Sequence, residues 1–118
     1  NRLPNPSGSD VAVLVSALNR TGDHLEDQNP EEAMRLYRRA AQQMEDLLSR
    51  EPLDAHRLRA VQTYDRIARA AHALGDAATS IASYRRAIPI IEELFRLHPN
   101  NTRYQRQISM TYGMMANY

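Results

Sequence analysis

Hydrophobic residues recur every three or four positions from Asp10 onward in this 118-residue chain, a spacing that predicts helices rather than strands. Short polar segments divide the pattern into five stretches, so we expect an all-α fold of five helices. The apolar positions of the first three stretches are Val11, Leu14, Val15, Leu18, Gly22 and Leu25, then Ala33, Leu36, Tyr37, Ala40, Met44, Leu47 and Leu48, then Leu58, Val61, Tyr64, Ile67, Ala68, Ala71 and Leu74. Those of the last two are Ile81, Tyr84, Ala87, Ile88, Ile91, Leu94 and Phe95, then Tyr104, Ile108, Tyr112 and Met115.

The polar segments carry start and stop signals for helices. Asn29 can cap a second helix that has Pro30 in its first turn. Asp54 is expected to cap the third helix, and Gly75 to end it in the left-handed conformation. Asp76 then caps the fourth helix. Residues 1–9, rich in Pro, Gly and Ser, predict a flexible tail or linker.

Pro89 lies inside the fourth stretch, where a proline removes one helical hydrogen bond. The apolar spacing nevertheless keeps its phase from Tyr84 to Phe95, and an intervening loop would break that phase. We therefore predict one continuous, kinked helix here.

An internal repeat connects the second and fourth helices. The segment Tyr37-Arg38-Arg39-Ala40 returns as Tyr84-Arg85-Arg86-Ala87, 47 residues later, and the proline that follows each helix recurs at the same offset. A repeat of this length built from helix pairs is typical of an α-solenoid, in which each pair buries its apolar face against the next. This divides the chain into unit one, 10–51, unit two, 53–98, and the first helix of a third unit, 101–118. The paired arginines could form an anion site, but we interpret them as solvated charges that pair with nearby acids along the helix.

These units resemble the tetratricopeptide repeat (TPR) family. The matching residues are Leu18, Thr21, Gly22, Leu25, Ala33, Tyr37 and Ala40 in unit one, and Tyr64, Ile67, Ala68, Ala71, Ser80, Tyr84 and Ala87 in unit two. The resemblance implies a right-handed α-solenoid of antiparallel helix hairpins that binds partners in a concave groove. The period is longer than the usual TPR period. It looks like that of the extended arrays C-terminal to kinase domains in some bacterial serine/threonine kinases, which implies a larger bacterial signalling protein.

Small residues have a physical reason at three repeat positions. Gly22, Ala68 and Ala116 are expected where the two helices of a unit approach most closely, because a large side chain there would force the helices apart. Tyr37 and Tyr84 are expected to fill the space between units. All five side-chain positions should then be buried.

The TPR register also implies which side chains line the groove. They are Ser16, Asn19, Asp23 and Glu26 in unit one, Gln62, Asp65, Arg66, Arg69 and His72 in unit two, and Met110, Gly113 and Asn117 in the third. Arg66 and Arg69 share a helix face and could clamp a carboxylate. The alternative is that Asp23, Glu26 and Asp65 already neutralise them.

The open C-terminal end offers a second surface. Tyr104, Ile108, Tyr112 and Met115 would form an apolar stripe with no following helix to cover it. We expect end-to-end self-association, giving a homo-oligomer, or a disordered fifth helix.

Composition points away from catalysis. The chain has no cysteine, its four histidines are not spaced as metal-ligand pairs on one helical turn, and no nucleophile or phosphate-loop motif occurs. With 15 basic and 14 acidic residues it has a net charge of +1, which disfavours nucleic-acid binding. No segment resembles a signal peptide or a membrane span. We therefore expect no cofactor and no metal.

The expected function is that of a cytoplasmic, non-catalytic module for binding a protein or peptide, with oligomerisation through the solenoid ends as the alternative. Because the chain begins at Asn1 rather than Met, we expect it to be a piece of a longer protein.

Overall fold

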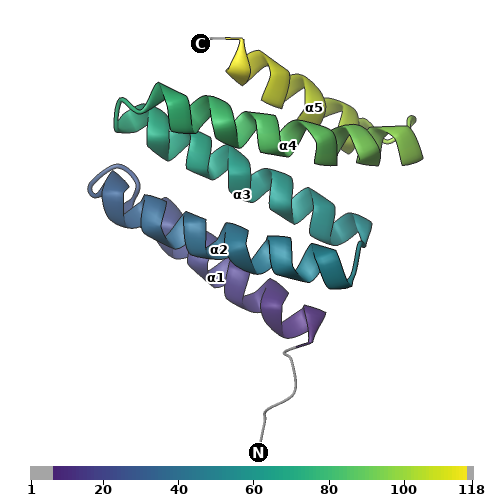
Figure 1. Ribbon diagram of the computed structural model, residues 1–118, viewed down its shortest axis with the longest axis horizontal. Coiled ribbons are helices and arrows are strands. Elements are labelled where there is room, and N and C mark those ends of the chain that lie inside the picture. Colours follow the sequence, from purple (N-terminus) through teal and green to yellow (C-terminus); the bar gives the residue numbers. More distant parts are fainter. Residues whose placement is uncertain (1–6, 117–118) are drawn as a thin grey trace, which may run out of the picture.

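The fold is all-α. The computed structural model describes residues 7–116 and contains five helices and no strand in that range (Figure 1). The helices are α1 (Gly8–Leu25), α2 (Pro30–Arg50), α3 (Asp54–Ala73), α4 (Ala77–Leu97) and α5 (Thr102–Met115). The five helices predicted from the apolar spacing are therefore confirmed.

The helices form two layers. In Figure 1, α2 and α4 lie in front and α1, α3 and α5 lie behind them. Each helix contacts the next along the chain, and α1 also contacts α3. The molecule measures 48 × 38 × 21 Å, and its smallest dimension matches two stacked helices of about 10 Å each. Because the connections are short, successive helices run in opposite directions.

Polar caps fix most of the helix ends. The Asn29 side chain accepts a hydrogen bond from the backbone N–H of Glu32 (3.2 Å), and Asp76 accepts one from that of Thr79 (3.1 Å). Gly75 ends the α3 region with a φ of 74°, a conformation that glycine adopts without steric cost. These three predictions are confirmed.

Two predicted boundaries are wrong. Helix α1 begins at Gly8, not Asp10, because Ser7 acts as its cap and accepts a hydrogen bond from the Asp10 backbone N–H (3.1 Å). The predicted linker 1–9 is therefore partly helical, and its residues 1–6 lie outside the described residues. Asp54 does not cap α3. It lies in the first turn and binds Arg57 (3.0 Å), while Leu53 holds the cap position without a side-chain hydrogen bond.

Helix α4 is continuous across Pro89, as the unbroken apolar phase predicts. Pro89 is exposed, so its ring lies away from the core. The carbonyl of Arg85, which loses its helical partner at this point, belongs to an exposed residue and can bind water instead. The continuous helix is confirmed.

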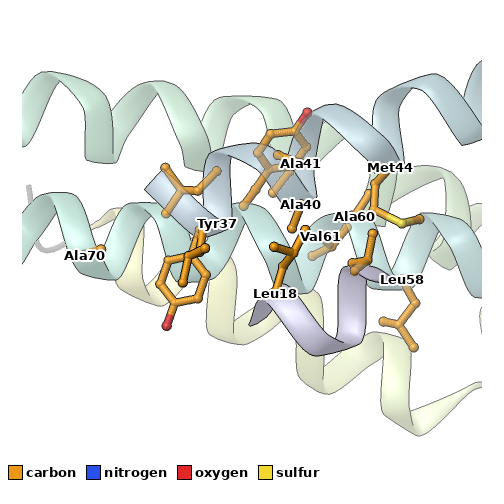
Figure 2. Packing of buried hydrophobic residues seen from close by; sticks show 14 of the residues in the cluster. Leu18, Tyr37, Ala40, Ala41, Met44, Leu58, Ala60, Val61 and Ala70 are labelled. Carbon is orange, nitrogen blue, oxygen red and sulfur yellow. The ribbon is translucent and has the colours of Figure 1, made fainter. Parts of the chain in front are cut away.

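A close contact between α1 and α2 lies at Gly22. The Tyr37 side chain is fully buried, and a Cβ atom placed on Gly22 would stand only 2.5 Å from Cε1 of the Tyr37 ring. Figure 2 shows Tyr37 among the core residues, with its hydroxyl oxygen directed away from Ala40 and Val61. The predicted tight crossing at Gly22 is confirmed, and the Tyr37 ring is what makes it tight.

Unit two uses a different pair of residues at its crossing. Ala68 is fully buried, and the buried Ser80 hydroxyl donates a hydrogen bond to the Ala68 carbonyl (2.9 Å). Tyr84 is also buried, with 1% exposure. Ala116, by contrast, is exposed, so the prediction of a tight crossing there is wrong for the described chain. No helix follows α5 within residues 7–116 to pack against it.

The Gly22 contact predicts opposite effects for two glycine substitutions. Gly22→Ala should lower the free energy of unfolding by about 1–2 kcal/mol, because overpacking against a buried ring outweighs the gain of about 1 kcal/mol in helix propensity. Gly113→Ala is the matched control, since a Cβ there meets nothing within 4 Å, and it should stabilise by about 0.5–1 kcal/mol. Urea unfolding followed by circular dichroism measures both. Equal effects of the two substitutions would contradict the Gly22 assignment.

Candidate interaction surface

Three adjoining hollows of about 390, 240 and 270 Å³ lie along α1, α3 and α5. Arg59 lines all three, and Gln62 lines two of them. We call this surface the α1–α3–α5 groove. Its residues are Ser9, Ala12, Val13, Ser16, Ala17, Asn19, Arg20 and Asp23 of α1, Ala55, Leu58, Arg59, Gln62 and Arg66 of α3, and Arg103 and Tyr104 of α5.

One end of the groove holds a cluster of charged groups around Asp23. Arg66 binds the Asp23 carboxylate through Nε and Nη2 (3.0 and 3.2 Å), and Tyr37 donates its hydroxyl hydrogen to the same carboxylate (2.6 Å). Arg69 binds Glu26 (2.7 Å) and also lies 3.5 Å from Asp23. Contacts from α1, α2 and α3 therefore meet at one carboxylate.

The electrostatics of this cluster follow from its contacts. Burial alone would raise the pKa of Asp23, but the hydrogen bonds from Arg66 and Tyr37 and the nearby arginine charges outweigh it, so the pKa lies below its ordinary value. Burial, together with the Asp23 carboxylate, raises the pKa of the Tyr37 hydroxyl. Arg66 and Arg69 are thus neutralised within the protein, which is the second of the two alternatives set out from the sequence.

Four more predicted groove residues have different outcomes. Asn19 is buried and donates to the Thr63 hydroxyl (3.0 Å), so its side chain holds α1 against α3. Gln62 lines the groove as expected. His72 is exposed and does not line any of the three hollows, and Asn117 lies outside the described residues.

Ser16 lines the groove, while Glu26 is tied to Arg69 beside it. Met110 and Gly113 are exposed residues of α5 that do not line the hollows. The third unit therefore contributes Arg103 and Tyr104 to the groove, and not the residues that the TPR register implied.

Asp65 faces α5 instead of the groove. Gln107 donates to its carboxylate (2.5 Å), and the Thr111 hydroxyl lies 3.4 Å from the same group. Burial raises the pKa of Asp65 to about 6, even though both hydrogen bonds and the charges of Arg66 and Arg69 act to lower it. Asp65 therefore anchors α5 on α3.

Three groove arginines were not found from the sequence. Arg20, Arg59 and Arg103 form no ion pair within residues 7–116. Arg59 donates through Nη1 to the Ser16 hydroxyl (2.8 Å), while its Nε is buried without a hydrogen-bond partner. Arg59 lies three residues before Gln62, so extending the predicted α3 face by one turn would have found it.

The predicted apolar stripe on α5 is divided by the packing. Tyr104 and Ile108 pack against the hydrophobic core. Helix α5 lies against α4, and its buried residues are Gln107 and Thr111. Met115 is half-buried. The exposed apolar side chains of α5 are Met110, Tyr112 and Met114, at 51, 42 and 40% exposure, so only Tyr112 belongs both to the predicted stripe and to the exposed set.

The described residues contain no group of three or more His, Asp or Glu side chains placed to hold a metal ion. None of the helices described has both the length and the hydropathy that crossing a bilayer requires. Comparison with protein-family models, curated proteins and solved structures finds no significant match to this chain. The case for function therefore depends on the groove itself.

The raised pKa of Asp65 predicts a pH-dependent stability. Because the folded chain binds this proton more tightly than the unfolded chain, the contribution of Asp65 to the free energy of unfolding should be highest below pH 4. It should fall as the pH rises from about 4 to about 6, and level off above. Asp65→Asn removes this titration. The stability of the native protein relative to the variant should fall by on the order of 2–3 kcal/mol between pH 3.5 and 7.5. A difference that does not change with pH would contradict the assignment.

Proposed function

We propose that this chain is a non-catalytic, TPR-like protein-interaction module that binds a peptide or protein segment in the α1–α3–α5 groove. The observation that carries the proposal is the row of three neighbouring hollows, which have Arg59 as a common lining residue and extend over three helices. A row of hollows of this kind suits an extended or helical segment better than a compact small molecule.

The groove is rigid because polar contacts join the helices that form it. The Asp23–Arg66 ion pair and the Asn19–Thr63 hydrogen bond link α1 to α3, and Gln107 links α5 to α3 through Asp65. A groove held in one shape loses little conformational entropy on binding, so more of the contact energy appears as affinity. Binding makes and breaks no covalent bond.

The wider context belongs to the same proposal. The resemblance to extended TPR arrays supports a right-handed solenoid, and a place in a larger bacterial signalling protein in the cytoplasm. The partner is a protein or peptide. No catalytic role, nucleic acid or membrane enters the proposal.

Selection of displayed random peptides on the whole chain tests groove binding. Gln62 lines two of the hollows and makes no side-chain hydrogen bond, so Gln62→Trp should fill the groove and weaken the selected peptides at least about tenfold. Gln42→Trp is the matched control, because Gln42 is an exposed residue of α2 that lines a separate hollow outside the groove. Isothermal titration calorimetry measures the affinities. Peptides that tolerate Gln62→Trp but not Gln42→Trp would place binding on the other face and overturn the proposal.

A second candidate function is self-association through the C-terminal end. Met110, Tyr112 and Met114 expose apolar surface on α5, and exposed apolar patches favour protein contacts. If this surface associates, light scattering at high concentration should show oligomers that Met110→Glu and Met114→Glu convert to monomers. A monomer at all concentrations would remove this candidate and leave groove binding unaffected.

A further inference from the structure

The α1–α3–α5 groove has an excess of positive charge. Four arginines line it, and Asp23 is the one carboxylate among its residues. Asp23 is already engaged by Arg66, Arg69 and the Tyr37 hydroxyl. The charges of Arg20, Arg59 and Arg103 therefore have no counter-charge in the described chain, although the whole chain has a net charge of only +1.

Arg59 stands at the centre of this unpaired charge. It lines all three hollows and is itself partly buried. Ser16 is the one side chain in residues 7–116 that accepts a hydrogen bond from it, through Nη1, and the Nη2 group, which is not buried, has no partner there. A cation that is partly desolvated and incompletely hydrogen-bonded gains most from a ligand that supplies both charge and acceptors, as a carboxylate does.

Apolar surface lies next to this cation. Val13, at 70% exposure, lines the first hollow together with Ala12, Ala17 and Arg59. Such a surface can accept an aliphatic side chain beside a charged contact. A peptide provides both kinds of group along one backbone, whereas a free carboxylate or phosphate provides only the charge.

We propose that the groove binds an acidic peptide segment of a partner protein. One carboxylate of the segment accepts hydrogen bonds from the Arg59 guanidinium, further carboxylates lie near Arg20 and Arg103, and an aliphatic side chain packs on Val13. This inference rests on the proposed function and gives the chemical class of its ligand.

Nucleic acid also carries negative charge, but it fits this surface less well. Single-stranded nucleic acid is held by successive aromatic side chains along a basic channel, and Tyr104 is the one aromatic residue lining the groove. The net charge of +1 gives the chain little long-range attraction for a polyanion. A peptide with a few carboxylates matches three arginines more closely.

The experiment uses the peptides selected on the whole chain from a random displayed library. We expect the selected sequences to be enriched in Asp and Glu and depleted in Lys and Arg. Their affinity should fall about tenfold in Arg59→Gln, because this substitution removes a partly buried, charge-assisted contact. Raising the salt concentration should weaken binding to the native chain more than to this variant.

Two further variants separate binding from folding. Arg20 and Arg103 are exposed and make no side-chain hydrogen bond, so the double variant Arg20→Gln/Arg103→Gln should keep the native melting temperature. It should still lose about twofold to fivefold in affinity. Arg85→Gln is the matched control, since Arg85 is an exposed, unpaired arginine of α4 that does not line the groove, and it should bind like the native chain. If Arg59→Gln lowers the melting temperature, the double variant decides the question.

Each other outcome overturns a specific claim. Selected peptides that need Gln62 but show no acidic preference would leave groove binding in place and refute the acidic ligand. Failure to select any peptide sensitive to Gln62→Trp would refute the proposed function itself. Polyuridylic acid that binds in an Arg59-dependent way and displaces the peptides would show that the groove binds nucleic acid, and would overturn this inference.

Discussion

The contact between the Tyr37 ring and the bare Cα of Gly22 sets the geometry on which the rest of the structure depends. The ring fills the space that a side chain at position 22 would need, so α1 and α2 approach closely. The Tyr37 hydroxyl then reaches Asp23, the residue next to this glycine, and Asp23 in turn holds Arg66 on α3. One aromatic side chain thus brings three helices together and orients one end of the groove.

Local signals made most of the fold predictable. Apolar spacing fixed the number of helices, and the caps at Asn29 and Asp76 fixed where two of them begin, because a cap acts within three residues of its own position. The start of α1 escaped prediction because Ser7 and Gly8 lie among prolines that favour a linker. The prediction that Asp54 caps α3 was wrong because a carboxylate suits either the cap position or the first turn of a helix. In the structure Asp54 lies in the first turn and binds Arg57.

The site was less predictable, because it depends on pairs far apart in the sequence. The helix face of Asp23, Gln62 and Arg66 follows from periodicity, but which arginines are neutralised depends on how α1 sits on α3. The helical register predicts that Asp65 lines the groove. In the structure Asp65 binds Gln107 of α5 instead, a residue 42 positions away, because of the way α5 is rotated about its axis. Periodicity contains no information on that rotation.

The attachment of α5 has a mechanical consequence. Its inner side meets α3 through Gln107 and Thr111, two polar side chains that share the Asp65 carboxylate, and Tyr104 and Ile108 pack against the hydrophobic core. Gln107 and Thr111 are the two buried residues of α5, whereas each of the other helices has at least five. Tension applied at the C-terminal side would therefore detach α5 as a unit before it disturbed the two hairpins.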